Sequence, residues 1–230
     1  MKDKILCICM GNNCGNLHGS KNDAILFYNY VYHLHENTSN SENWLKPYIF
    51  LDSNVAVENV KKVINDNDDY DKILIYYSGH GYSNGNLNIY NSRHGLVRDR
   101  DLFQEINSVL KHDIELYIIL DSCYSGCINT IPFDKIKKIN LIASSCCNQL
   151  SSESLTSFSN LPFNINYYYD QLKIVKRNLI TGVFTFNLID QLVNKKINKI
   201  SDFAIIFSQF KETWKTVSLI GNQNPKIIWK

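Results

Sequence analysis

The 230-residue sequence has no long apolar stretch and no regular cysteine pattern. No run of 18 or more apolar residues occurs, so the sequence predicts no membrane-spanning helix. The N-terminal apolar run, residues 5–10, is too short for a signal peptide and no small-residue cleavage site follows it. The seven cysteines are odd in number and lack the spacing of a secreted disulfide framework. We therefore expect an intracellular, reducing location, namely the cytoplasm.

The sequence also lacks a block of charge of one sign. Its 24 basic and 22 acidic residues are spread along the chain and give a formal net charge of +2. This pattern indicates no nucleic-acid partner and no membrane partner. Because 44% of the residues are hydrophobic, a chain of this length can bury a core without metals or disulfides, and we expect one domain over residues 1–230.

Short apolar runs alternate with segments of helical periodicity. Strands that alternate with helices predict a parallel sheet covered on both faces. A small hairpin is expected at 84–93, and residues 154–178 lack periodicity and are interpreted as a loop. Strands are expected at 4–10, 48–51, 73–77, 115–120, 139–143 and 226–229, and helices at 20–36, 99–110, 179–193 and 201–217, with one more helix after a cap at Asp52 and Ser53.

Two of the expected strands run into residues suited to covalent catalysis. One continues into SGHG at 78–81, and another into DSC at 121–123. In a parallel sheet these strand ends meet at one edge, where ligands bind. A thiol is a modest nucleophile at neutral pH until an imidazole takes its proton, so Cys123 and His80 are a sufficient pair. The backbone N–H groups of Gly81 and Cys123 are candidates for an oxyanion hole.

Other interpretations of these residues stay open at this point. His80 in a glycine turn could be structural, and Cys123 could be a buried thiol. A zinc site made of Cys123, Cys127 and His80 is a third interpretation, although the CxxxC spacing departs from the usual CxxC.

The motifs YYSGHG at 76–81 and DSCYSG at 121–126 resemble the two active-site motifs of the caspase-like cysteine peptidases, most closely those of metacaspases. The resemblance implies a caspase-like (caspase-hemoglobinase) α/β fold, with a mostly parallel sheet of about six strands and helices on both faces. It also implies a large portion at 1–153, a linker at 154–178 and a small portion at 179–230. Four further segments carry the resemblance over nearly the whole chain: LHGSKNDA at 17–24, SSCCNQLSSES at 144–154, GVFTF at 182–186 and QNPKI at 223–227.

The resemblance implies an endopeptidase that cleaves proteins or peptides after Arg or Lys. Cys123 would be the nucleophile, and His80 the general base and later the acid. Two carboxylates at the base of a pocket attract a basic side chain, and Arg can pair with them bidentately. As alternatives, Asp23 could cap the first helix and Asp121 could accept backbone N–H groups at the turn. The residues of the implied pocket for the basic side chain, the S1 pocket, are Ser20, Asp23, Ser78 and Asp121.

Several features depart from the metacaspase pattern. Tyr124 follows the cysteine where the family usually has His, and Ser20 stands where it usually has Cys. Many metacaspases have an acidic insertion that contributes to a calcium site, and residues 82–94 contain no acid. The calcium candidates that remain are Asp99 and Asp101, two carboxylates for a cation that takes six or more oxygens. We expect no required cofactor and interpret these acids as capping a helix.

Self-cleavage and oligomeric state are also expectations from the resemblance. Metacaspases tend to be monomeric, so we expect a monomer. A rival hypothesis for the whole chain is a caspase-like fold retained as a non-catalytic interaction module, and another is a thiol redox or metal protein. The linker contains three basic residues that match the implied specificity, with solvated side chains as the alternative: Lys173, Lys176 and Arg177.

Overall fold

A seven-stranded sheet forms the centre of the molecule. The computed structural model describes residues 4–36, 43–84, 86–91, 95–128, 133–157, 178–197, 199–203 and 226–228. The strand order is β11-β8-β7-β4-β1-β2, with β3 also paired to β1. All neighbours are parallel except β11, which runs antiparallel to β8. The strands are β1 (Lys4–Gly11), β2 (Asn43–Trp44), β3 (Tyr48–Leu51), β4 (Lys72–Ser78), β7 (Ile114–Asp121), β8 (Ile136–Ala143) and β11 (Lys226–Ile228).

This sheet confirms the predicted fold class. It is about six strands wide, as expected, because the short strands β2 and β3 both lie along the same edge of β1. β11 confirms the last strand expected from the sequence over the residues that the structure describes.

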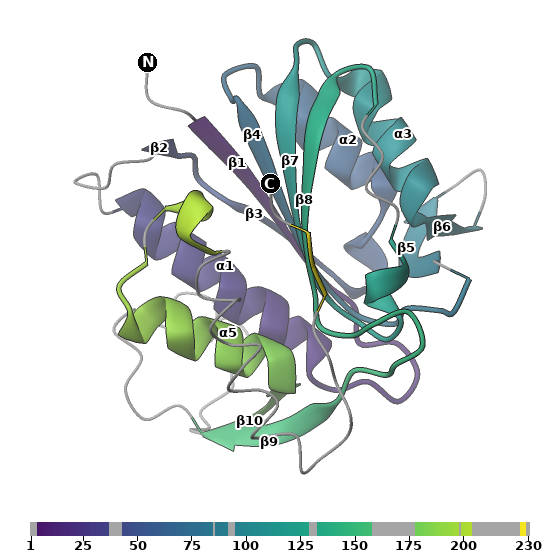
Figure 1. Ribbon diagram of the computed structural model, residues 1–230, viewed down its shortest axis with the longest axis vertical. Helices are drawn as coiled ribbons and strands as arrows, with labels where there is room; N and C mark the ends of the chain where they lie inside the picture. The colour runs from purple at the N-terminus through teal and green to yellow at the C-terminus, as the bar shows by residue number, and fades with distance from the viewer. Residues whose placement is uncertain are drawn as a thin grey trace.

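Helices cover both faces of the sheet (Figure 1). On one face lie α1 (Ser20–Glu36) and α5 (Val183–Asn194), and on the other α2 (Val57–Asp66) and α3 (Asp99–Val109). Successive side chains of a strand alternate between the two cores: on β4, Tyr76 packs in the core under α1, and Tyr77 in the core under α2 and α3. Both faces are therefore apolar, which explains why these strands form continuous apolar runs in the sequence.

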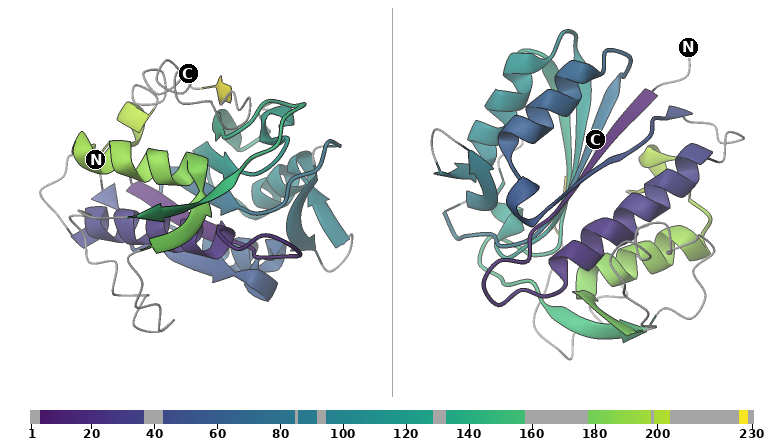
Figure 2. Two further views of the ribbon diagram at one scale, coloured as in Figure 1. Left: turned by 90° about the horizontal axis from the view of Figure 1, so that it is seen from below. Right: turned by 180° about the vertical axis from the view of Figure 1, so that it is seen from behind.

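Two small antiparallel sheets lie beyond the central one. β5 (Asn86–Asn91) pairs with β6 (Gly95–Arg98), which confirms the hairpin expected in this region. β9 (Glu153–Ser157) pairs with β10 (Asn178–Gly182), and this pair lies beside α1 and α5 (Figure 1, Figure 2). The sequence itself does not predict β9 or β10. Their alternation of buried and exposed residues is too short to recognise: in β10 it covers only Leu179, Ile180 and Thr181.

Two helices begin later than the sequence suggested. α5 starts at Val183 because β10 occupies the preceding residues. α2 starts at Val57, and Asp52 does not cap it: its carboxylate accepts the N–H of Asn13 at 3.1 Å and pairs with Lys21 at 2.8 Å. Asp52 thus joins the end of β3 to the start of α1. The helix expected at 201–217 lies mostly outside the described residues, which include the short 3₁₀ turn Ile200–Asp202.

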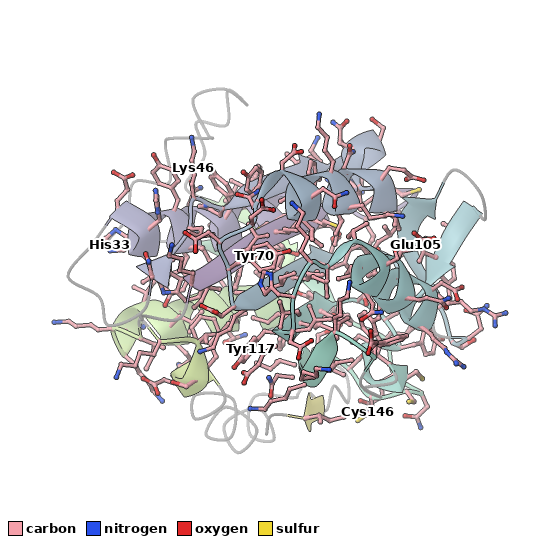
Figure 3. All side chains as sticks on the ribbon, turned by 90° about the horizontal axis from the view of Figure 1, so that it is seen from above. His33, Lys46, Tyr70, Glu105, Tyr117 and Cys146 are labelled. Atoms are coloured by element: carbon pink, nitrogen blue, oxygen red, sulfur yellow. The ribbon has the colours of Figure 1, made fainter. Side chains whose placement is uncertain are left out.

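None of the described helices has the length and apolar character needed to cross a membrane. The side chains of the molecule are drawn in Figure 3, where Tyr70 lies near the middle of the view and Cys146 at the periphery.

The packing of α1 on the sheet leads to a prediction about stability. Phe27 of α1 stacks on Tyr76 of β4 with ring centroids 4.4 Å apart, and neither residue is exposed. We expect Phe27→Ala to lower the free energy of unfolding by about 3–5 kcal/mol, because it leaves a cavity under a buried aromatic ring. Urea unfolding measures this change. The control is Leu96→Ala, at a residue that is 42% exposed, and equal losses for the two variants would contradict the packing described.

Candidate active site

The predicted site residues meet outside the carboxyl ends of three strands. From β1 the chain passes to β3 on one side of the sheet and then returns to β4 on the other side, so the strand order reverses between β1 and β4. Open α/β sheets bind ligands at such a switch point. A pocket lies here, and the residues predicted as nucleophile, base and S1 pocket all line it: Cys123, His80, Ser20, Asp23, Ser78 and Asp121.

The loop after β4 is held in place by a tyrosine from that strand. The hydroxyl of Tyr77 donates a hydrogen bond to the carbonyl of His80 at 2.8 Å. A Cβ atom on Gly79 would lie 2.5 Å from the Tyr77 hydroxyl, so a side chain at position 79 would collide with this hydroxyl. The N–H of Gly79 donates to the carbonyl of Asp121 at 3.2 Å, which joins this loop to the end of β7.

The imidazole of His80 is oriented by a backbone carbonyl. Its Nε2 atom lies 2.9 Å from the carbonyl oxygen of Cys14, in the loop between β1 and α1. A carbonyl can only accept, so Nε2 carries the hydrogen, and Nδ1 is the nitrogen that can take up a proton. Gly15 adopts a φ of 63° beside the ring. The sequence gives no indication of this role of Cys14, because its contribution is a main-chain atom.

Cys123 lies on a sharp turn after β7 and is half-buried. Its Sγ accepts a hydrogen bond from the N–H of Ser151 at 3.3 Å. The next residue, Tyr124, has left-handed backbone angles (φ 56°, ψ 14°), and its N–H donates to the carbonyl of Gln149 at 2.8 Å. This bond offsets part of the cost of an unfavourable conformation for a residue other than glycine.

The backbones of Gly81 and Cys123 are in direct contact. A Cβ atom at position 81 would lie 2.1 Å from the carbonyl oxygen of Cys123, so glycine is required there. Gly81 also forms an isolated bridge with Leu87, which attaches the β5–β6 hairpin to this loop.

Two buried carboxylates, Asp23 and Asp121, line the pocket on its inner side; we call them the acid pair. Asp23 is 1% exposed and Asp121 is 4% exposed. Asp23 accepts the hydroxyl of Ser78 and the N–H of Gly182, both at 2.8 Å. Asp121 accepts the N–H of Thr185 at 3.1 Å and its hydroxyl at 2.7 Å. A further donor to Asp121 is the hydroxyl of Ser151, in the segment before β9, at 2.6 Å. These donors therefore come from β4, β10, α5 and that segment, and not from the first helix or the cysteine turn that the alternatives proposed.

The acid pair is electrostatically strained. A Cβ atom on Gly182 would lie 2.0 Å from Oδ2 of Asp121 and 3.0 Å from Oδ2 of Asp23, so Gly182 lies against both carboxylates. Burial raises the pKa of Asp23 well above its usual range, and the charge of Asp121 raises it further. Burial also raises the pKa of Asp121, against hydrogen bonds from Ser151 and Thr185 that lower it. A cation bound beside the pair would favour its ionised form.

Comparison with known proteins identifies the fold and the family. The family model described as Caspase domain matches residues 4–214 of the sequence. The chain belongs to the caspase-domain family. Membership of this peptidase family supports a cysteine peptidase. The crystal structure of protein GSU0716 from Geobacter sulfurreducens is similar, with a TM-score of 0.58 and 14% sequence identity over 98% of this chain and 92% of that one. At this identity the likeness shows the fold alone. No curated protein gives a significant match to the sequence.

The pocket of this caspase domain contains a third carboxylate that the sequence analysis missed. Glu153, at the start of β9, accepts the N–H of Gly19 at 2.7 Å and the N–H of His18 at 3.0 Å. It thereby holds the segment that leads into Ser20 and Asp23, and its charge also raises the pKa of Asp23 after the larger effects of burial and Asp121. The segment 144–154 did resemble the family, but only the pairing of β9 with β10 places Glu153 at the pocket.

The metal candidates do not assemble into a site in the part of the caspase domain that the structure describes. There, no three His, Cys, Asp or Glu side chains are grouped so that they could hold an ion, so the zinc interpretation of Cys123, Cys127 and His80 has no support. α3 begins at Asp99, and Asp101 is exposed in its first turn. A carboxylate in the first turn, such as that of Asp101, favours a helix N-terminus, and the N-cap position itself is occupied by Arg98.

The three candidate self-cleavage residues, Lys173, Lys176 and Arg177, lie outside the described residues.

The raised pKa of Asp23 leads to a prediction about stability and pH. The pKa of Asp23 is about 3.9 in the unfolded chain and higher in the folded protein. Asp23 therefore destabilises the fold increasingly as the pH rises from the unfolded-state pKa through the folded-state pKa. Asn can keep both hydrogen bonds, because its oxygen accepts from Gly182 and its amide donates to Ser78. We therefore expect the free energy of unfolding of Asp23→Asn, relative to the unliganded wild type, to increase between pH 4 and pH 7. Urea unfolding at several pH values tests this.

The matched control for that measurement is Asp134→Asn, at an exposed acid far from the pocket. Its difference from the wild type should stay constant over the same pH range. Parallel curves for Asp23→Asn and the wild type would contradict the strain assigned to the acid pair.

Proposed function

We propose that this caspase domain is a metacaspase-like cysteine endopeptidase that cleaves after Arg or Lys. The observation that carries the specificity is the acid pair, two buried carboxylates in the pocket that Cys123 and His80 also line. Membership of the caspase-domain family supports the peptidase activity.

The charge of the pocket supports a cationic P1 side chain, the side chain just before the cleaved bond. Asp23 and Asp121 repel each other, and a guanidinium or ammonium group beside them would relieve that repulsion. Each carboxylate has about four lone-pair sites, and the protein donors occupy only some of them. An acidic P1 side chain would add a third buried negative charge, and a neutral one would leave the pair uncompensated. Ser20 and Ser78 complete the proposed S1 pocket.

The proposed chemistry uses one thiol and one imidazole. Nδ1 of His80 takes the proton of the Cys123 thiol, and the thiolate attacks the scissile carbonyl, so that a C–S bond forms. The N–H groups of Gly81 and Cys123 would stabilise the negative oxygen. The C–N bond then breaks, His80 donates its proton to the leaving amine, and a thioester remains. Water, deprotonated by His80, hydrolyses the thioester and restores the thiol.

We also propose that residues 1–153 and 179–230 correspond to a large and a small portion. The bonds from Gly182 to Asp23 and from Thr185 to Asp121 join the two portions, and α1 packs on α5. Cleavage within the linker at Lys173, Lys176 or Arg177 would therefore leave both portions associated. We also propose that the protein is a monomer and requires no metal. The basis for this is the resemblance to metacaspases alone.

The first test removes the proposed dyad. We expect Cys123→Ala to abolish cleavage of fluorogenic peptides ending in Arg or Lys, and His80→Ala to lower kcat by about 10²–10⁴-fold, because each step needs a proton transfer. Unfolding curves check that both variants fold. Full activity of Cys123→Ala would exclude this mechanism. The peptide assay is also run over a range of calcium concentrations, and a wild type that is inactive at all of them would favour the non-catalytic interaction module.

The same two proteins test self-cleavage. The wild type and Cys123→Ala are incubated, and mass spectrometry then shows whether either chain has been cut.

The second test concerns the acid pair. We expect Asp23→Asn and Asp121→Asn each to lower kcat/KM for an Arg peptide by about 30-fold or more, the loss expected when a buried charge pair worth at least 2 kcal/mol is broken. Because the pKa of both acids is raised, KM for the wild type should increase as the pH falls and the pair takes up protons. Asp134→Asn serves as the control. An unchanged preference for Arg over norleucine in both variants would remove these acids from the pocket.

A further inference from the structure

The segment 144–151 forms hydrogen bonds with several residues of the turn that carries Cys123. The hydroxyl of Ser144 accepts the N–H of Ser122 at 3.2 Å, and that of Ser145 donates to the carbonyl of Ser122 at 3.0 Å. Further along, the carbonyl of Gln149 accepts the N–H of Tyr124 at 2.8 Å. The position of the nucleophile therefore depends on this segment, whose Cys146 lies at the periphery in Figure 3.

Ser151, at the end of the segment, contacts both functional parts of the pocket. Its backbone N–H donates to Sγ of Cys123 at 3.3 Å. Its hydroxyl donates to Oδ1 of Asp121 at 2.6 Å and accepts from the hydroxyl of Ser144 at 3.1 Å. One residue thus bridges the thiol and the acid pair.

We propose that Ser151 is a positioning residue that couples a cationic side chain in the pocket to the reactivity of Cys123. The identity of that side chain as Arg or Lys rests on the proposed function. An ionised carboxylate only accepts hydrogen bonds, so a cation that keeps Asp121 ionised also keeps it as the acceptor for the Ser151 hydroxyl. A hydrogen bond to a charged acceptor is about twice as strong as one between neutral groups.

The coupling reaches the sulfur through the backbone of the same residue. When the hydroxyl is held by the charge of Asp121, the N–H of Ser151 is held at the sulfur and fixes the position from which the sulfur attacks. A protonated Asp121 can instead donate to the Ser151 hydroxyl, which releases this constraint. The nucleophile is then most reactive when a basic side chain occupies the pocket, which favours attack on the matching substrate.

The experiment measures alkylation of Cys123 by iodoacetamide at fixed pH, with the Cys123 peptide quantified by mass spectrometry because the chain has seven cysteines. The rate constant is measured without ligand, with saturating N-acetyl-arginine amide, and with N-acetyl-norleucine amide, which has a similar length but no charge. Steric blocking by either ligand is the same in the wild type and in Ser151→Ala. We call the rate constant with the arginine ligand divided by that without ligand the arginine ratio. We expect the arginine ratio to be about 2- to 10-fold higher in the wild type than in Ser151→Ala, the range expected for one hydrogen bond.

Four further measurements separate coupling from a merely structural role. The norleucine ratio should be equal in the wild type and Ser151→Ala. Ser151→Thr, which keeps the hydroxyl, should restore the arginine ratio. Ser154→Ala, at an exposed residue of β9, should match the wild type throughout. With peptide substrates, Ser151→Ala should lower kcat by a similar 2- to 10-fold and change KM little, because the acid pair that binds the basic side chain is retained.

Equal arginine ratios in the wild type and a folded Ser151→Ala would overturn the coupling. If the wild type then still cleaves after Arg, the proposed function stands and only the coupling fails. Alkylation of the wild type that does not respond to the arginine ligand would also overturn the coupling, and the S1 assignment falls with it only if the wild type shows no preference for Arg peptides. A response that Ser151→Ala lacks and Ser151→Thr restores would support the coupling even in a protein that cleaves no peptide.

Discussion

The burial of Asp23 and Asp121 next to each other is the constraint on which the rest of the site depends. Two carboxylates out of contact with water are costly unless each is hydrogen-bonded. The donors come from Ser78 of β4, from Ser151, and from two residues of the C-terminal part, Gly182 and Thr185. The pocket and the docking of β10 and α5 on the sheet are therefore formed together.

The docking of α5 on the sheet also depends on the N–H groups and the partial positive charge at the N-terminus of this helix. Gly182 is the residue before its first turn, and Thr185 is its third residue. The first N–H groups of a helix have no partners within the helix, and its N-terminus carries a partial positive charge. Asp121 accepts one of these N–H groups from the end of β7, so it caps a helix through a residue that lies 64 positions later in the chain. Binding of a basic side chain by the same carboxylate would connect substrate recognition to the stability of the small portion.

The two residues proposed as catalytic, His80 and Cys123, are held by main-chain contacts more than by side chains. The carbonyl of Cys14 orients His80, and the N–H of Ser151 contacts Cys123. Glycines allow these approaches, most clearly at Gly81, where any side chain would collide with the carbonyl of Cys123. This explains why the motifs around His80 and Cys123 contain glycine, and why their partners leave little trace in the sequence.

The sequence by itself determined six of the seven strands of the central sheet, all but β2, together with the helices of the first two thirds of the chain and the residues gathered at the strand ends. Continuous apolar runs and helical periodicity are local signals, and the carboxyl ends of parallel strands must meet at one edge. The tertiary structure alone decided that Ser151, Glu153 and Thr185 contact the pocket, because each acts through a partner more than 25 positions away. β9 and β10 are formed by pairing with each other, so no local pattern predicts them. The electrostatic strain of the acid pair arises only when folding brings Asp23 and Asp121 together away from water.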